Sequence, residues 1–320
     1  MYTVGIDIGG TKISSALFDS DGNCFNHSYA EVGKTSGDAV CDIVLGAVSS
    51  QLEYSRRFNY HVGGVGLCVP GIYWSQKKTV WAPNINGWED YPLFDKVTGF
   101  INNPDISVNI DSDRACCILG EVWKGAAMGA KNAIYMAVGT GIGIGVLING
   151  EVLRGANDIA GATGWLALER PFNTKYTSCG CFEYSASGAG LGRKASELLT
   201  DKPDYQGNLR NISPDNITGR DVFEAFFKGD EIAKEVIINA IELWGMAVAN
   251  YVSLFNPEVI ILGGGVFGPA VQFIPAIYKE AKKWAQPLSV NLVKLTDSKL
   301  GTDAGLFGAG YLAGNFQIKT

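Results

Sequence analysis

The chain has 320 residues, of which 47% are hydrophobic and 18% charged, a composition that supports large buried cores and excludes a mostly disordered protein. At about 150 residues per domain, this length predicts two domains. The net charge of −6 and the lack of a basic stripe argue against a nucleic-acid partner. The 41 glycines follow no collagen repeat, so we expect them at specified places.

Cellular location is predicted from three features. The first residues predict a strand instead of a secretory signal, and no apolar run approaches the roughly 18 residues that cross a membrane. The seven cysteines lie mostly among apolar residues, which is typical of reduced thiols. We therefore expect a cytoplasmic protein without a membrane partner.

The two histidines leave little room for histidine-based metal sites or catalytic triads.

The N-terminal region predicts three consecutive strands. Residues 2–8 are apolar and β-branched, Gly9-Gly10 interrupts this strand, and a second strand is expected over residues 13–18. Asp21-Gly22 is a strong signal for a hairpin turn before the third strand.

A helix and two further strands follow. Ser36 is expected to cap a helix in which apolar residues recur with a helical period over residues 40–52. Strands are expected over residues 62–69, ending at Pro70-Gly71, and over residues 107–110, before another helix.

The pattern of the N-terminal region then recurs. Residues 133–138, 144–148 and 151–154 predict strands, with a glycine turn over 139–143 and a tight turn at 149–150. Two copies of the same pattern predict a duplicated domain in which each copy offers a glycine loop. Chance similarity of two glycine hairpins is the alternative.

The C-terminal part predicts mainly helices. Residues 201–218 are polar and are expected to form a surface loop, and a short buried strand is expected over 259–262. The small residues of the last predicted helix are expected to allow close backbone packing. The predicted helices span 232–255, 269–286 and 303–313.

Glycine loops after strands are typical of phosphate sites, because successive backbone N–H groups can converge on phosphate oxygens. In the first loop, Asp7 would repel phosphates unless Mg²⁺ lay between them, bound through water. The second loop is followed by a strand, which argues against a dinucleotide-binding fold. The third cluster, Gly263–Val266, suits backbone approach to an adenine or a ribose. A plain β-hairpin is the alternative for the first loop.

Two carboxylates, Asp111 and Asp113, lie between the two repeats, after a strand and before a helix. A carboxylate there can accept the proton of an attacking hydroxyl, which phosphoryl transfer to an alcohol requires. An aspartate that caps the helix is the alternative, and we favour it for Asp111.

In this order, the motifs GIDIGGTK (5–12), SDRACCILGE (112–121), GTGIGIG (139–145), GCFE (180–183) and ILGGGV (261–266) resemble the ROK family of sugar kinases and sugar-responsive repressors. The resemblance covers essentially the whole chain. It implies an α/β fold of the actin-like ATPase (ribonuclease H-like) type, duplicated, with two domains around a cleft for nucleotide and sugar. The implied domains are residues 1–112 plus 303–320 and residues 113–302, and the implied assembly is a homodimer.

The resemblance also implies roles at matching positions. Asp113 falls on the catalytic aspartate of the family, and ATP and Mg²⁺ are the implied cofactors. The implied nucleotide contacts are Asp7, Gly9, Gly10, Thr11, Lys12, Gly139, Thr140, Gly141, Gly143, Gly263, Gly264, Gly265 and Val266. The expected sugar contacts are Gly71, Asn84, Ser112, Trp165 and Glu183.

Three departures from the family pattern concern the sugar and the metal. Ser112 replaces the asparagine before the catalytic aspartate, and Ala162 and Trp165 replace a sugar-binding glutamate and a histidine. The zinc element keeps only Cys179 and Cys181, so we expect no structural zinc. Trp165 either stacks on a sugar ring or an aglycone, or fills the volume of the lost metal site.

These departures lead to a prediction about the substrate. The missing glutamate and histidine would contact the anomeric end of a free hexose. We therefore expect an ATP-dependent kinase for a hexose-like substrate whose anomeric hydroxyl is absent, substituted or differently oriented. A non-catalytic sugar sensor is the alternative; because the sequence starts at the first strand, we do not expect the DNA-binding form of the repressors.

Overall fold

The computed structural model describes residues 1–314. Backbone contacts divide the chain into two compact units. Unit 1 comprises residues 1–131, 145–160 and those from Ser298 onward, and unit 2 comprises residues 132–144 and 161–297. The division into residues 1–112 plus 303–320 and 113–302 stays a prediction, and its last six residues lie outside the described residues.

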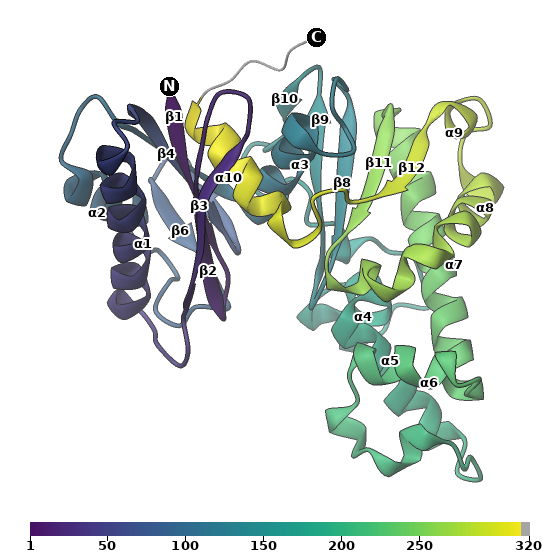
Figure 1. Cartoon of the computed structure of the whole chain (residues 1–320). Helices are drawn as coiled ribbons and strands as arrows, with labels where there is room; N and C mark the ends of the chain where they lie inside the picture. The colour runs from purple at the N-terminus through teal and green to yellow at the C-terminus, as the bar shows by residue number, and fades with distance from the viewer. Residues whose placement is uncertain (315–320) are drawn as a thin grey trace. The chain divides into compact units, whose positions relative to one another are not determined.

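The sheet of unit 1 has five strands in the order β3-β2-β1-β4-β7 (Figure 1). β1 pairs antiparallel with β2 and parallel with β4. The strands are β1 (Tyr2–Ile8), β2 (Lys12–Phe18), β3 (Cys24–Glu31), β4 (Val62–Val69) and β7 (Ser107–Ser112); a separate hairpin is formed by β5 (Ile72–Trp74) and β6 (Thr79–Trp81). The helices of this unit are α1 (Asp38–Arg57), α2 (Leu93–Ile101), α3 (Asp113–Lys124) and α10 (Ala304–Gly314).

The two faces of this sheet differ in side-chain size. Val4, Ile6 and Leu67 belong to a buried cluster that also contains Val44 of α1. The alternate residues of β1 and β4 include glycines, which lie against α10: a Cβ on Gly66 would lie 2.0 Å from the backbone oxygen of Ala309. Because side chains alternate between faces along a strand, one face packs by side chains and the other by backbone contact.

α10 and α3 pack closely through their glycines. A Cβ on Gly308 would lie 1.7 Å from the backbone oxygen of Cys116, and one on Gly120 would lie 2.3 Å from that of Ala304. The prediction that small residues in the last helix allow close backbone packing is thereby confirmed.

The second sheet repeats the strand order of the first, as β10-β9-β8-β11-β12. The boundary between the two units falls within β9. The strands are β8 (Ala133–Val138), β9 (Ile142–Ile148), β10 (Glu151–Val152), β11 (Val259–Gly263) and β12 (Lys294–Asp297). In both sheets the first strand of a glycine hairpin pairs in parallel with a later strand, β1 with β4 and β8 with β11. The repeated order confirms the duplication.

Unit 2 carries most of the helices. These are α4 (Cys181–Ala186), α5 (Gly188–Asp201), α6 (Gly219–Phe227), α7 (Glu231–Phe255), α8 (Ile274–Trp284) and α9 (Ser289–Leu292). The fully buried Trp244 of α7 donates a hydrogen bond from Nε1 to the backbone oxygen of Ala186, over 3.0 Å. The short 3₁₀ helices of this unit span Thr163–Trp165, Thr174–Ser178, Asn208–Asn211, Pro214–Asn216, Gly265–Phe267 and Pro269–Phe273; a further one, Gly301–Asp303, lies in unit 1.

The structure corrects several local predictions. Gly37, not Ser36, precedes α1, and no side chain caps that helix. β9 begins at Ile142 because the glycine turn is tighter than expected, and β10 ends at Val152. The helix expected over 269–286 is a 3₁₀ turn followed by α8. Ser112, not Asp111, caps α3.

Two general features of the described part of the chain bear on location. None of its helices combines the length and the apolar character that crossing a membrane requires. All seven cysteines are free thiols.

Candidate functional site

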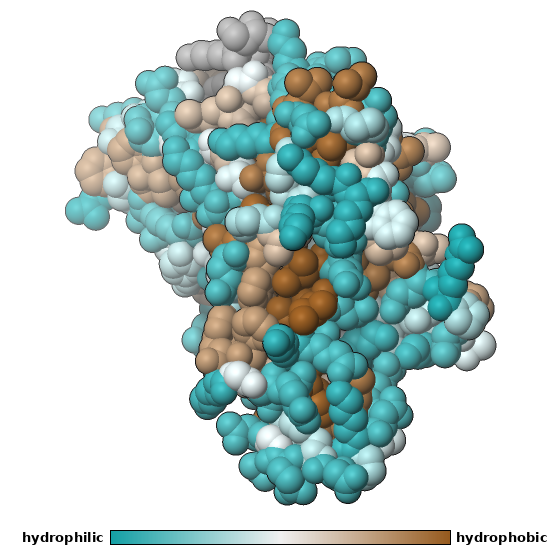
Figure 2. Space-filling view, turned by 90° about the vertical axis from the view of Figure 1, so that its right-hand side faces the viewer, coloured by the Kyte–Doolittle hydropathy of each residue, from teal (hydrophilic) through white to brown (hydrophobic). Residues whose placement is uncertain are grey.

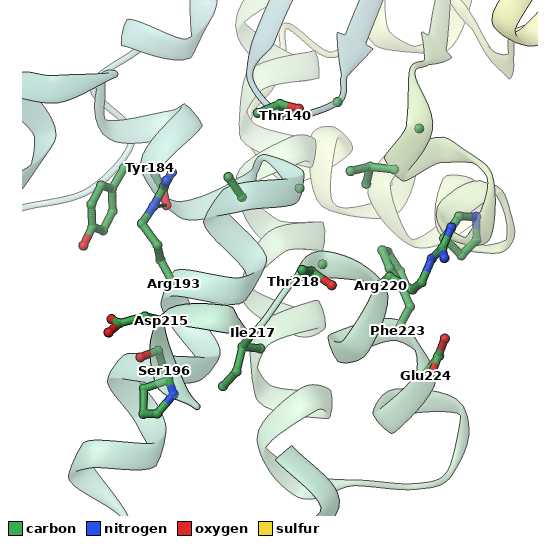
Figure 3. A pocket seen from close by; sticks show the side chains of 18 of the residues that line it. Thr140, Tyr184, Arg193, Ser196, Asp215, Ile217, Thr218, Arg220, Phe223 and Glu224 are labelled. Atoms are coloured by element: carbon green, nitrogen blue, oxygen red, sulfur yellow. Dashed lines mark hydrogen bonds between the residues drawn. The ribbon is translucent and has the colours of Figure 1, made fainter. Parts of the chain in front are cut away.

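A pocket of about 1110 Å³ lies within unit 2 (Figure 3). Gly139 and Thr140 of the second glycine loop line it together with Gly265 and Val266 of the third cluster. The structure therefore brings these two predicted segments to one cavity. The remaining lining residues come from α4, α5, α6, the segment before α6 and Pro269.

The glycines of this region fall into two kinds. A Cβ on Gly139 or Gly265 would meet no atom within 4 Å, so both leave open space beside the backbone. A Cβ on Gly264 would lie 2.5 Å from the backbone oxygen of Val138, and its φ is +86°. A Cβ on Gly263 would lie 2.1 Å from the hydroxyl of Tyr135. Gly263 and Gly264 thus allow close packing, whereas Gly139 and Gly265 expose backbone to the pocket.

Two helices begin at the pocket wall. Gly188 opens α5 and Gly219 opens α6, and both line the cavity. The backbone N–H of Gly188 donates to the backbone oxygen of Gly139 over 2.8 Å. Helix N-termini carry partial positive charge and favour anions, so this wall suits a phosphate group.

Sequence reasoning missed these helix starts. The signal is present as a hydroxyl residue followed by glycine, since Ser187 and Thr218 cap α5 and α6 with their side chains. Pro214, Asp215 and Ile217, within the segment expected to be a surface loop, also line the pocket.

Glu183 on α4 lies beneath the second glycine loop. Its Oε2 accepts a hydrogen bond from the backbone N–H of Ile142 over 2.7 Å. Burial raises the pKa of this carboxyl, while the Ile142 N–H and the Arg193 guanidinium act in the opposite direction. Arg193 lies over the Tyr184 ring at 4.7 Å and also lines the pocket. The predicted sugar contact is thus linked to the pocket wall.

Polar contacts hold residues 174–181, the segment that replaces the zinc element. The carboxylate of Glu169 accepts hydrogen bonds from Ser185 Oγ and, over 3.4 Å, from Tyr176 Oη. Lys194 Nζ lies 3.7 Å from the same carboxyl group. Within residues 1–314, no three His, Cys, Asp or Glu side chains are grouped so that they could hold a metal ion.

Trp165 ends the short 3₁₀ helix Thr163–Trp165 and is 58% exposed. A side chain this exposed fills no buried volume. Its indole ring is therefore available to a ligand.

The first glycine loop forms a tight turn in unit 1, with the N–H of Gly9 donating to the backbone oxygen of Lys12 over 2.9 Å. A Cβ on Gly10 would lie 3.6 Å from Cβ of Asn84, so the loop adjoins an expected sugar contact. Gly71 has a packing role as well, because a Cβ there would lie 2.1 Å from the backbone oxygen of Trp81.

Asp7 is a desolvated carboxylate at the end of β1. Burial raises its pKa to about 6, and the charges of Asp113 and Asp303 add to the effect, whereas Cys68 and Lys12 oppose it. A Cβ on Gly305 would lie 3.0 Å from Asp7 Oδ2. The region around Asp7 therefore has an excess of negative charge.

Asp113 is the first residue of α3, and its side chain is 53% exposed. The surrounding protein raises its pKa by desolvation, and the Arg114 guanidinium and backbone N–H counteract this. Ser112 Oγ accepts a hydrogen bond from the N–H of Ala115 over 3.3 Å, so this expected sugar contact already caps the helix. The exposed carboxylate of Asp113 is free to meet a substrate.

The predicted site residues divide between the two units. Unit 1 contains Asp7, Gly9, Gly10, Thr11, Lys12, Gly71, Asn84, Ser112 and Asp113. Unit 2 contains Gly139, Thr140, Gly141, Gly143, Trp165, Glu183, Gly263, Gly264, Gly265 and Val266. Their roles stay predictions.

Comparisons with known proteins give a consistent result. A model of the ROK family matches residues 3–315. A glucokinase of Halalkalibacterium halodurans is 32% identical over 317 residues, which are 97% of this chain and 94% of the relative. A xylose repressor of Bacillus spizizenii is 28% identical over 310 residues, which are 96% of this chain and 75% of the repressor.

The fold is also that of a solved structure. The crystal structure of a ROK family glucokinase from Streptomyces griseus in complex with glucose and AMPPNP matches with a TM-score of 0.77 and 29% identity, over 99% of this chain and 100% of that one. The fold is therefore the duplicated α/β fold of the actin-like ATPases. Since the family model matches nearly the whole length, the chain belongs to the ROK family.

Proposed function

We propose that the protein is an ATP-dependent sugar kinase, which transfers the γ-phosphoryl group to a hydroxyl of a hexose-like substrate. The pocket carries this proposal, because two glycine segments and two helix N-termini line it. Glucokinases are among the relatives that match nearly the whole chain, and the similar glucokinase structure contains AMPPNP.

ATP would bind with its phosphates along the open backbone of Gly139 and Gly265. The N-termini of α5 and α6 add partial positive charge beside them. Phe223 and Ile217 supply apolar surface in the same pocket, which suits a purine base. These contacts position the nucleotide, and positioning is the larger part of catalysis in phosphoryl transfer.

Asp113 is the proposed general base. Its carboxylate would accept the proton of the sugar hydroxyl as that oxygen attacks the γ-phosphorus and the bond to the leaving ADP breaks. Desolvation by the surrounding protein raises the pKa of Asp113 above its ordinary value, which makes the carboxylate a stronger base. Lys12 and Thr11, in the first loop, would contact phosphate oxygens.

Asp7 fits a hydrated Mg²⁺ that arrives with ATP. Asp113 and Asp303 both raise its pKa through their charges, so a cation would relieve their repulsion. Mg²⁺ in proteins is usually bound by one or two carboxylates together with waters and substrate phosphates, so the single carboxylate of Asp7 is sufficient. When bound, the ion would neutralise charge on the phosphate oxygens.

We propose further that the sugar has an absent, substituted or differently oriented anomeric hydroxyl, as in a glycoside, a disaccharide, an anhydro sugar or a cyclitol. Glu183, Asn84 and Gly71 would contact its hydroxyls, and Ser112 would do so through the hydroxyl that caps α3. The exposed ring of Trp165 supplies an apolar face where a free hexose would need polar partners. A free hexose with a far better specificity constant than any such compound would contradict this idea.

A non-catalytic sugar sensor is the second candidate, because a xylose repressor also matches the chain. The exposed carboxylate of Asp113 and the nucleotide-type pocket favour the kinase. Cytoplasmic location stays a prediction.

A homodimer is proposed on the basis of exposed apolar residues in unit 2. Leu254, Trp284, Leu288 and Leu292, near the ends of α7, α8 and α9, are 62–78% exposed. Figure 2 shows hydrophobic patches among hydrophilic residues on the side that carries these helices. Sedimentation of the purified protein at several concentrations tests this.

The experiment that tests the proposed activity is an ADP-release screen with Mg·ATP against free hexoses, N-acetylhexosamines, glycosides and cyclitols. At least one compound is expected to give turnover that Asp113→Asn abolishes. ADP release that no sugar stimulates, together with tight sugar binding, would support the sensor instead.

A further inference from the structure

An ion pair with a buried carboxylate lies in unit 1, where β7 ends and α3 begins. Arg154 donates to Asp111 Oδ2 from both Nε, over 2.9 Å, and Nη2, over 2.6 Å. The Asp111 side chain is only 9% exposed, whereas that of Arg154 is 41% exposed. Asp111 is thus a carboxylate inside the protein whose charge one guanidinium balances.

The second oxygen of Asp111 is bound to the backbone. The N–H of Ser112 donates to Asp111 Oδ1 over 2.8 Å, and Ser112 in turn caps α3. The next residue is Asp113. The carboxylate of Asp111 therefore connects Arg154 with the peptide that leads directly into the proposed base.

The loop that carries Arg154 is itself anchored. The N–H of Ala160 donates to the backbone oxygen of Arg154 over 3.0 Å, which closes the loop. Asp158 Oδ2 accepts hydrogen bonds from Ser75 N, over 3.0 Å, and Ser75 Oγ, over 2.9 Å. The guanidinium is thus presented to Asp111 from a loop held at two further points.

We infer that Arg154 is a positioning residue that acts through Asp111 to hold Asp113 in place for proton transfer. This inference rests on the proposed function. Without Arg154, Asp111 would be an unpaired buried carboxylate, which is costly. It would turn toward water or take up a proton, and the Ser112 N–H would lose a charged acceptor. A displacement of the base by about 1 Å costs about 10²-fold in rate.

A double-mutant cycle on turnover tests this inference, with the best sugar from the screen as substrate. Arg154→Met and Asp111→Asn are each expected to lower kcat by about 10²-fold, with the KM for ATP and for the sugar within about twofold of wild type. The kcat of the double variant is expected to be no lower than the kcat of the less active single variant. If Arg154 instead contacts the substrate, its loss will raise the sugar KM, and its effect will persist in the Asp111→Asn background; that result overturns the inference.

Two further variants separate positioning from general damage. Arg154→Lys keeps the charge but not the paired donors, so it is expected to recover part of kcat. Lys202→Met removes an exposed ion pair of the same length, 2.6 Å, between Lys202 and Glu235 in unit 2. It is expected to leave kcat unchanged, and a loss equal to that of Arg154→Met would overturn the inference.

Amide hydrogen exchange tests the inference independently of turnover. If no sugar is phosphorylated, the proposed function is wrong, but the structural effect of Arg154 on residues 112–115 can still be measured. Arg154→Met is expected to speed exchange of the amides from Ser112 to Ala115 by at least about tenfold. Lys202→Met is expected to leave these amides unchanged. Unaltered exchange in Arg154→Met would overturn the inference.

Discussion

The two glycine hairpins share a backbone plan and differ in charge. β1 and β2 flank the first, and β8 and β9 flank the second. Asp7 lies two residues before Gly9 in the first, and Ala137 lies two residues before Gly139 in the second. Asp7 has the carboxylates of Asp113 and Asp303 nearby. The second hairpin instead adjoins the N-terminus of α5.

This difference suggests how a duplicated hairpin acquires two tasks. Backbone N–H groups of a glycine turn suit phosphate oxygens in both copies. A carboxylate in the first copy requires a cation before phosphate can approach, whereas helix N-termini in the second favour phosphate directly. We interpret the first hairpin as the place for metal and acceptor chemistry and the second as part of the nucleotide pocket.

The largest expected effect comes from making the first hairpin resemble the second. Asp7→Ala introduces the residue that the second hairpin has, and is expected to lower turnover by about 10³-fold, equivalent to about 4 kcal/mol, because the metal would lose its carboxylate. ADP affinity measured without divalent metal is expected to stay within about twofold. Retention of more than about a tenth of wild-type turnover would contradict the assigned difference.

The ionised carboxylate of Asp7 is also expected to lower the free energy of unfolding. Its pKa is about 6 in the folded protein, above the ordinary value, so the folded state binds more protons between pH 4 and 6 and loses stability as the pH rises through this window. Asp7→Asn is therefore expected to match wild type below about pH 4 and to be more stable by up to about 3 kcal/mol above pH 6. Urea unfolding at several pH values measures this, and a variant less stable than wild type at pH 8 would show that burial does not strain Asp7.

Neighbouring glycines near the second hairpin are expected to respond differently. Gly264→Ala places a side chain at positive φ against Val138, and is expected to cost about 2 kcal/mol of unfolding free energy. Gly265→Ala meets no protein atom, so stability is expected to hold while ATP affinity falls by about tenfold. Thermal unfolding and calorimetry test the pair, and equal destabilisation would argue against an open backbone at Gly265.

Much of the fold could be predicted from the sequence because its signals are local. The bounds of β1, β4 and β8 follow from mostly apolar, buried runs that end at a glycine or a proline. The part of the pocket wall from Pro214 to Ile217 could not be predicted. Its polar composition resembles a surface loop, and Ile217 is buried only by tertiary contacts. The Arg154–Asp111 pair, 43 residues apart, has no local signal either.

A smaller effect is expected at the sugar side of unit 2. Trp165→Ala is expected to raise the sugar KM by about tenfold, through loss of stacking worth about 1 kcal/mol. Because the ring is exposed, the unfolding midpoint is expected to stay the same. A drop in the midpoint without a change in KM would assign Trp165 to structure instead.

The smallest effect is expected from zinc removal. Tyr176, in the segment where the family carries its zinc element, contacts the Glu169 carboxyl, which Ser185 and Lys194 also contact. Dialysis against a zinc chelator, followed by thermal unfolding, is expected to leave the midpoint unchanged. A lower midpoint that added zinc restores would contradict this.

The most direct measurement compares wild type with Asp113→Asn under Mg·ATP and the best sugar, following phosphoryl transfer by ³¹P NMR and ATP binding by calorimetry. We predict transfer to the sugar in the wild type, a loss of at least about 10³-fold in the variant, and equal ATP affinity in both. Undiminished transfer by Asp113→Asn would contradict the account.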